Sequence, residues 1–203
     1  MSNAKDLLIS ALRDRSSTIS QFRHTTMRLS EILAQEAAST IQAETINTQT
    51  SITQTQGFKI TKPVVLIPIL RSGLALLPAF LSIFPEATVG LVGMKRNEQS
   101  AIPELYYKNI PKIAPNAQVI VLDPMIATGG SATDTLKIIT SMGVAQEQIV
   151  FVGVISAPEG LAKMSQYFPK VKIIVGVQDQ GLTPNNFINP GLGDFGDRFF
   201  GTE

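Results

Sequence analysis

Residues 119–133 read Val119-Ile-Val-Leu-Asp123-Pro-Met-Ile-Ala-Thr128-Gly-Gly-Ser-Ala-Thr133, an apolar run that ends in an acid and is followed by two glycines. This order predicts a buried strand, a short turn and the first turn of a helix. Ligands of open α/β sheets bind at the carboxyl ends of strands, and free N–H groups at a helix N-terminus attract anions. Because Gly129 and Gly130 have no side chain to keep an anion away from the main chain, the turn predicts a phosphate site.

Polar side chains complete this stretch. Thr128, Ser131 and Thr133 supply hydroxyl donors, and Asp123 stands at the strand end, where a carboxylate can bind vicinal hydroxyls of a sugar. The stretch therefore predicts a site for a sugar 5-phosphate. A nucleoside triphosphate loop is not indicated, because no Gly-Lys-Ser or Gly-Lys-Thr is present in it.

Short apolar runs and helical stretches alternate after Pro63. The apolar runs are 64–69, 88–94, 119–122, 149–155 and 172–177, and helices are expected at 73–84, from the glycine turn to about 142, and from about 158. Such alternation predicts parallel βαβ units. The expected fold class is α/β, a Rossmann-like parallel sheet flanked by helices with a short extended arm, in a single domain spanning residues 1–203.

Three segments differ from this pattern. Residues 1–38 show helical periodicity, with a break and an N-cap at Ser16–Thr18. Residues 39–56 contain six threonines and four glutamines but a single charge, which fits either a two-stranded arm or a polar loop. Residues 95–115 combine charges, two tyrosines and three prolines with little helical period, which fits either a flexible binding loop or a plain surface connection.

Composition excludes several classes of protein. The 203 residues include no cysteine and one histidine, which excludes a disulfide scaffold, a thiol nucleophile and a multi-histidine metal site. Lysine and arginine total 17 against 16 acidic residues, so no broad basic surface for nucleic acid is expected. No apolar run reaches the ~20 residues of a membrane span, and no signal peptide is recognised. We expect a cytoplasmic protein that binds neither nucleic acid nor membrane.

Two further stretches carry candidate binding residues. Pro68-Ile-Leu-Arg71-Ser-Gly73 ends the first apolar run and offers an arginine for a second anion, which Arg96 of the 95–115 segment could also contact. The last 17 residues hold four glycines and four phenylalanines, so this end is expected to pack and to curve around a small flat ligand. Asp194 and Asp197 lie there as candidates to bind a metal-bridged phosphate or a proton of the ligand.

Together these stretches resemble the uracil phosphoribosyltransferase family. The matching strings are Pro-Ile-Leu-Arg-Ser-Gly at 68–73, Gly-Met-Lys-Arg-Asn-Glu at 93–98, Asp-Pro-Met-x-Ala-Thr-Gly-Gly-Ser at 123–131, Ala-Pro-Glu-Gly at 157–160 and Pro-Gly-Leu-Gly-Asp-Phe-Gly-Asp-Arg at 190–198. The resemblance extends from about Ala11 to the C-terminus and implies the type I phosphoribosyltransferase fold.

The implied reaction joins uracil to 5-phospho-α-D-ribose 1-diphosphate (PRPP) and yields UMP and diphosphate, in pyrimidine salvage. The resemblance also implies Mg²⁺ as cofactor and a homodimer or homotetramer, and it leaves GTP open as an effector.

The resemblance assigns roles by position. Asp123, Arg96 and Asp194 would take part in catalysis. Uracil would be recognised by Ile188, Gly193, Asp194 and Phe195 within the segment 181–203, mainly through the main chain. No residue would ligate a metal directly, because Mg²⁺ would be held mainly by the substrate, with Asp194 acting through water. The residues implied to bind PRPP are Arg71, Arg96, Asp123, Pro124, Met125, Ile126, Ala127, Thr128, Gly129, Gly130, Ser131 and Asp194.

Two residues depart from the pattern of the family. The chain has Phe187 where a tyrosine is usual, and Asn189 where an apolar residue is usual. Both flank the base-binding segment, so a phosphoribosyltransferase for another base is an alternative. A second alternative is a catalytically weak nucleotide-binding regulator of the same fold. The charged residues that the resemblance assigns to the site are all present, namely Arg71, Arg96, Asp123 and Asp194. Their presence favours an enzyme over a regulator.

Overall fold

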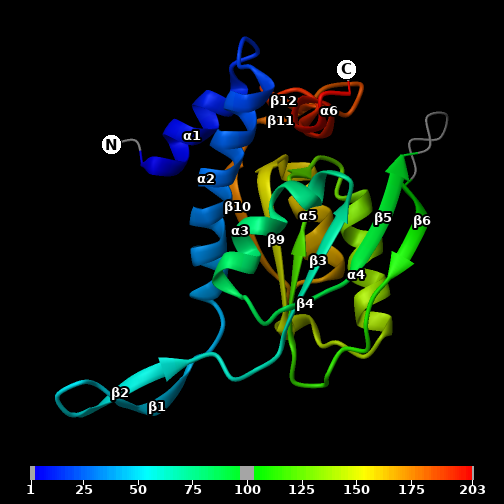
Figure 1. Cartoon of the computed structure of the whole chain (residues 1–203). Helices are drawn as coiled ribbons and strands as arrows, with labels where there is room; N and C mark the ends of the chain where they lie inside the picture. Colours follow the sequence, from blue (N-terminus) through cyan, green and yellow to red (C-terminus); the bar gives the residue numbers. More distant parts are fainter. Residues whose placement is uncertain (1–2, 97–102, 203) are drawn as a thin grey trace.

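The centre of the molecule is a mostly parallel sheet (Figure 1). The structure, a computed structural model, describes residues 3–96 and 103–202. Within this part of the chain the sheet has eight strands in the order β10-β9-β7-β3-β5-β6, with β4 beside β3 and β8 beside β9. All pairs are parallel except β5 with β6. The strands are β3 (Val64–Leu70), β4 (Thr88–Val89), β5 (Leu91–Arg96), β6 (Pro103–Asn109), β7 (Gln118–Leu122), β8 (Met125–Ile126), β9 (Ile149–Ser156) and β10 (Lys172–Gln178).

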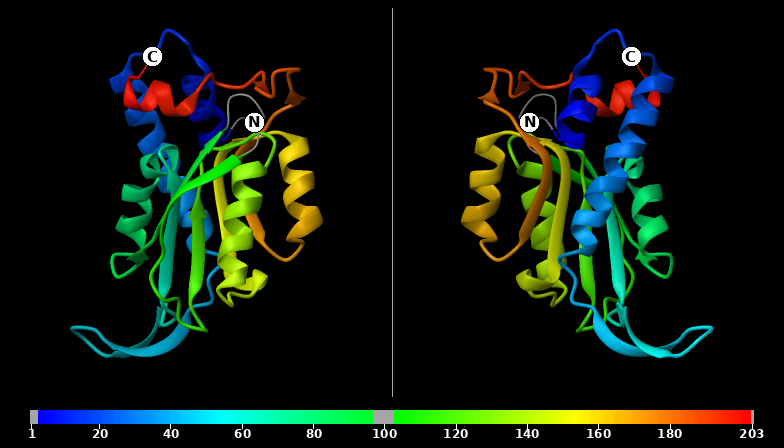
Figure 2. Two further views of the ribbon diagram at one scale, coloured as in Figure 1. Left: turned by 90° about the vertical axis from the view of Figure 1, so that its right-hand side faces the viewer. Right: turned by 90° about the vertical axis from the view of Figure 1, so that its left-hand side faces the viewer.

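Helices cover both faces of this sheet (Figure 2). Successive residues of a strand point to opposite faces, so Leu66 packs in the core on one face and Ile67 in the core on the other. Both faces are buried, which explains why the strands are continuous apolar runs and confirms the α/β class. The first core is covered by α1 (Ala4–Arg13), α2 (Ile19–Ala38), the 3₁₀ turn η1 (Ser72–Ala75) and α3 (Leu77–Ile83), and the second by α4 (Gly130–Ser141) and α5 (Pro158–Tyr167).

The two N-terminal helices begin where the sequence provides caps. Asn3 accepts a hydrogen bond from the Asp6 N–H and Thr18 accepts one from the Gln21 N–H, and in both cases the third residue of the helix bonds back to the cap. The predicted break before Thr18 is therefore confirmed.

Residues 39–59 contain the arm. Strands β1 (Glu44–Gln49) and β2 (Gln54–Lys59) pair antiparallel, with Glu44 opposite Lys59, and the hairpin extends away from the sheet (Figure 1). Of the two interpretations left open by the sequence, the two-stranded arm is the one observed.

Two segments contain elements that the periodicity did not predict. The strand β6 occupies the middle of residues 95–115, whereas residues 97–102 of the expected flexible loop lie outside the described part of the chain. Near the C-terminus, β11 (Gly181–Leu182), β12 (Ile188–Asn189) and α6 (Phe195–Phe200) follow one another. The expected packing of this end is confirmed, because Phe195 is fully buried with its ring centre 5.3 Å from that of Phe22. No helix in the described ranges is long and apolar enough to cross a bilayer.

Candidate active site

Asp123 follows β7 directly, at the carboxyl edge of the sheet. Its N–H donates to the carbonyl of Val152 at 3.1 Å, so the main chain is held in line with the neighbouring strand. Its carboxyl group accepts hydrogen bonds from the Ser72 hydroxyl and, at 3.5 Å, from the Met125 N–H. The residue is only 8% exposed, and burial raises the pKa of Asp123 to about 7 although both hydrogen bonds oppose the increase. A ligand that brings hydroxyl donors or a cation would favour the charged form.

The turn between β8 and α4 presents free main-chain N–H groups. Gly129 has φ of +71°, a left-handed conformation that glycine adopts without strain. Because α4 begins at Gly130, the N–H groups of Gly130, Ser131 and Ala132 have no partner within the helix. Thr133 donates both its N–H and its hydroxyl to the Gly129 carbonyl, at 2.9 and 2.6 Å. The expectation that the Thr133 hydroxyl faces the ligand is therefore wrong, since this buried group stabilises the turn instead.

The start of α5 packs against the turn between β8 and α4. A Cβ placed on Gly129 would lie 2.7 Å from the carbonyl oxygen of Gly160, and a Cβ on Gly160 would lie 3.1 Å from the main-chain nitrogen of Gly129. The two backbones therefore touch. This contact gives the Ala-Pro-Glu-Gly string at 157–160 a structural role in holding the turn.

A pocket of about 450 Å³ opens beside Asp123. Its wall combines the end of β3, the acidic end of β7, the first turn of α4 and the start of α6. The predicted residues that it brings together are Arg71, Asp123, Met125, Ser131, Asp194 and Phe195. Pro124, Ile126, Ala127, Thr128, Gly129 and Gly130 form the adjoining strand-and-turn segment rather than this wall.

Arg71 at the end of β3 is held only loosely. Its Nη2 lies 3.6 Å from Oδ1 of Asp197, and its guanidinium carbon lies 5.5 Å from the ring centre of Phe200. The side chains of Arg71 and Asp197 are 58% and 38% exposed, and ion pairs so exposed to water are weak. Arg71 can therefore exchange this contact for an anionic ligand in the pocket.

Apart from Asp194, the residues of the segment from β11 to α6 that were predicted to bind uracil offer main-chain groups rather than side chains. The side chains of Ile188 and Phe195 are buried in the core, so only their main chains can face a ligand. Gly193 is exposed, with φ of +84°. Phe187 is 59% exposed, and its N–H donates to the Thr183 hydroxyl at 3.1 Å.

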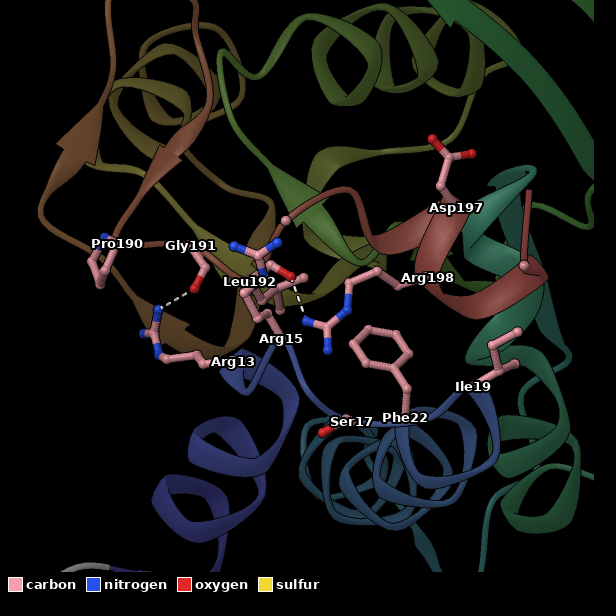
Figure 3. A pocket seen from close by; sticks show the side chains of 12 residues that line it. Arg13, Arg15, Ser17, Ile19, Phe22, Pro190, Gly191, Leu192, Asp197 and Arg198 are labelled. Atoms are coloured by element: carbon pink, nitrogen blue, oxygen red, sulfur yellow. Dashed lines mark hydrogen bonds between the residues drawn. The ribbon is translucent and has the colours of Figure 1, made fainter. Parts of the chain in front are cut away.

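The remaining predicted residues lie apart from the pocket beside Asp123. Gly193 lines a second pocket, of about 510 Å³, between the α1–α2 connection and the C-terminal segment (Figure 3). Ile188 is not among the residues lining either pocket. Arg96 ends β5, but its side chain lies outside the described residues.

The carboxylates fit a magnesium ion that is shared with a substrate. Asp123 and Asp194 line the same pocket, and carboxylate oxygens are ligands that Mg²⁺ prefers. Asp194 uses Oδ1 to accept the Asp197 N–H at 3.0 Å, and a carboxylate can accept further hydrogen bonds from water. Among the described residues no three His, Cys, Asp or Glu side chains gather as a metal cluster. The donor set therefore suits an ion that arrives with phosphate oxygens.

Five residues of the pocket wall were not among the predicted site residues: Ile69, Leu70, Ser72, Met94 and Gly196. Ser72 bonds to Asp123, and Met94 reaches the wall from β5. Ser72 follows Arg71 in the quoted string 68–73, so its position at a strand end was a usable signal. Met94 lies in the string Gly-Met-Lys-Arg-Asn-Glu at 93–98, but no role was predicted for its side chain.

The sheet, with an acid and a glycine turn at its carboxyl edge, defines a phosphoribosyltransferase fold. A hypoxanthine phosphoribosyltransferase from Trypanosoma cruzi, solved with the product IMP, shares this fold with a TM-score of 0.53 at 12% identity, over 79% of this chain and 75% of that one. The AQ2163 protein from Aquifex aeolicus is much more similar, with a TM-score of 0.90 and 33% identity over 98% of this chain and 96% of that one.

The chain belongs to the uracil phosphoribosyltransferase family. The family model described as "Uracil phosphoribosyltransferase" matches residues 2–202. Uracil phosphoribosyltransferases of Salinibacter ruber and Campylobacter curvus are 40% and 38% identical to it over 194 residues, which is 96% of this chain and 91% and 92% of theirs.

Proposed function

We propose that this protein is a uracil phosphoribosyltransferase, which converts uracil and PRPP to UMP and diphosphate. The observation that carries the proposal is the convergence of Asp123, Ser131, Arg71 and Asp194 on one pocket, in a chain of this family. These groups match the parts of PRPP, which has a 5-phosphate, two ribose hydroxyls and a diphosphate.

The phosphate turn and Asp123 orient the ribose. The free N–H groups at the start of α4 bind the 5-phosphate, while the Asp123 carboxylate accepts hydrogen bonds from the ribose hydroxyls. Breaking the C1–O bond builds positive charge on the ribose and negative charge on the departing diphosphate. Arg71 and Arg96 stabilise the negative charge. A Mg²⁺ ion held mainly by the substrate and, through water, by Asp194 would neutralise more of it. The protein supplies no nucleophile. N1 of uracil bonds to C1 as the C1–O bond to the diphosphate breaks, and the proton of N1 passes to the departing diphosphate. The protein positions N1 against C1 and excludes water.

Base selection follows from main-chain hydrogen bonding. Uracil presents an acceptor, a donor and an acceptor along O2, N3–H and O4, which two N–H groups flanking a carbonyl complement. We place these groups in the main chain of Ile188, Gly193 and Phe195, whose two larger side chains are already in the core. Cytosine presents acceptor, acceptor and donor, so it leaves buried groups unpaired, a mismatch that can cost ~10⁴ in kcat/KM.

A product assay tests the proposal. Purified protein is incubated with PRPP, Mg²⁺ and labelled uracil, with cytosine, hypoxanthine and orotate as competing bases. UMP and diphosphate in equal amounts are expected, with little effect of the competitors. Preferential use of another base would favour the alternative that Phe187 and Asn189 suggest, and absence of turnover with every base would favour a nucleotide-binding regulator.

Phe187→Tyr is expected to change kcat/KM for uracil by less than about tenfold. Phe187 is 59% exposed, so we expect an added hydroxyl to be accessible to water, where a net hydrogen bond contributes only ~1 kcal/mol. Steady-state kinetics of both forms with uracil and the three competing bases provide the measurement. A wild type that ignores uracil, together with a tyrosine form that accepts it, would overturn the substrate assignment but leave the phosphoribosyl chemistry.

The protein is expected to form a homodimer or homotetramer in the cytoplasm. Two apolar residues of the arm support assembly, since Ile52 and Phe58 are 91% and 77% exposed and burying them against another subunit would be favourable. Light scattering at micromolar concentration measures the mass. A monomer would contradict this part of the proposal, and an effect of GTP would be sought on the assembled form.

A further inference from the structure

The segment 188–195 is held by arginines from both ends of the chain (Figure 3). Arg198 of α6 donates to the carbonyls of Leu192 at 2.6 Å, Leu12 at 2.5 Å and Asp14 at 2.6 Å. Its guanidinium carbon lies 4.3 Å from the ring centre of Phe22. Arg198 therefore connects this segment to the end of α1 and the residues that follow it.

The contact with Leu192 sets the direction of the next N–H group. A peptide unit is planar, and in the trans form its C=O and N–H point in opposite directions. The Leu192–Gly193 peptide is not among the cis bonds of the described chain. Because the Leu192 carbonyl points to Arg198, the Gly193 N–H points away from Arg198. This N–H has no hydrogen-bond partner within the described residues, and Gly193 is one of the residues that we place against the base.

A buried ion pair fixes the preceding peptides. Arg13 forms a two-point ion pair with Asp179, whose side chain is 3% exposed. Asp179 accepts the Gly191 N–H at 2.8 Å, and Arg13 donates to the Gly191 carbonyl at 2.7 Å. Burial alone would raise the pKa of Asp179, but the hydrogen bonds from Arg13 and Gly191 outweigh it and lower the pKa, so the group is a carboxylate at neutral pH.

We propose that Arg198 is a positioning residue for base recognition, which aims the Gly193 N–H at the base while Arg13 and Asp179 fix the peptides before it. The inference rests on the proposed function. Three successive peptide units are held by charged partners, and such hydrogen bonds are roughly twice as strong as neutral ones. The main chain therefore cannot turn to present the Leu192 carbonyl, an acceptor, in place of the Gly193 N–H, a donor. Such a change would be required to pair with the amino group of cytosine.

The test separates base recognition from general stability. Arg198→Met keeps an apolar stem beside Phe22 and removes the donors, and Arg198→Lys keeps the charge without the planar fork. We expect Arg198→Met to raise the KM for uracil at least about tenfold and the KM for PRPP less than about threefold. The ratio of kcat/KM for uracil to kcat/KM for cytosine should fall. Arg198→Lys should lie between this variant and the wild type.

Arg23→Met is the matched control. Arg23 also donates to a carbonyl, that of Phe199 at 2.7 Å, and also lies over a ring, 5.6 Å from the centre of Phe199. This partner lies outside the segment 188–195. It should leave both KM values within about twofold of wild type. Parallel increases in both KM values for Arg198→Met, or an equal effect of Arg23→Met, would show a merely structural role and overturn the proposal.

If the Arg198 variants do not fold, Arg13→Lys tests the same positioning of the segment 188–195 instead. One ammonium group keeps the charge beside Asp179 but lacks the fork that reaches both Asp179 and the Gly191 carbonyl. We expect an increase of about threefold in uracil KM with unchanged PRPP KM. Unchanged uracil KM in every folded variant overturns this inference alone. A wild type that makes no UMP overturns the proposed function, and this inference with it.

Discussion

Asp123→Asn is expected to lower kcat/KM at least ~30-fold and at the same time to stabilise the folded protein above about pH 7. The loss of activity reflects the loss of a charged acceptor for the ribose hydroxyls, worth ~2 kcal/mol or more. The gain in stability follows from burial, because Asp123 is 8% exposed and the pKa of its carboxyl group is raised to about 7. Asparagine keeps the shape without the buried charge.

The pH dependence has a definite sign. The pKa of Asp123 rises from 3.8 to about 7 on folding, so between these values the folded state holds a proton that the unfolded chain has released. The contribution of this group to stability therefore falls as pH rises through this range. At about pH 8 the variant should be more stable by at least ~1 kcal/mol, or roughly 3 °C in Tm, and the difference should vanish below about pH 4.

Thermal unfolding and steady-state kinetics across this pH range provide the measurement. Asp134→Asn is the control, since Asp134 lies on α4 with its Oδ1 2.9 Å from Lys137 at the surface, and its loss should change neither quantity appreciably. An Asp123→Asn form that keeps more than roughly a tenth of the activity would count against the ribose role. An Asp123→Asn form less stable than wild type at about pH 8 would contradict the claim that the buried Asp123 carboxylate destabilises the folded protein.

Gly129→Ala is expected to raise PRPP KM at least about tenfold. Alanine at φ of +71° is strained, and its Cβ would lie 2.7 Å from the carbonyl oxygen of Gly160. The turn must move to relieve this contact. The N–H groups at the start of α4 then no longer point toward the 5-phosphate. Kinetics with varied PRPP measure the effect.

Gly143→Ala provides a control with similar backbone strain. Gly143 has φ of +92° beyond the other end of α4, and nothing lies within 4 Å of the site of its Cβ. Alanine there should cost ~1–2 kcal/mol of stability with unchanged PRPP KM. Equal effects of the two substitutions on PRPP KM would show that strain alone, and not displacement of the phosphate turn, is responsible.

The parts of the site that are local in the chain could be predicted from the sequence. The strand, the acid and the glycines of 119–133 lie consecutively, and their order alone indicates a strand end with an anion site. The buried strands could be predicted for the same reason, because both faces of the sheet are covered and the runs are continuously apolar.

The parts that depend on distant partners could not be predicted. Arg13 and Asp179 are 166 positions apart and meet only because α1 and the end of β10 lie together. Thr133 has the same hydroxyl as Thr128, and only the start of α4 decides that it bonds to Gly129 instead of a ligand. The strand β6 pairs at the edge of the sheet with β5 and has no periodicity of its own.

A crystal structure of the protein with UMP tests the central claim most directly. We expect the phosphate to accept hydrogen bonds from the N–H groups of Gly130 and Ser131, the ribose hydroxyls to contact the Asp123 carboxylate, and the base to face the main chain of Ile188, Gly193 and Phe195. UMP with its phosphate away from the 128–131 turn, or with its base directed away from the segment 188–195, would contradict the account.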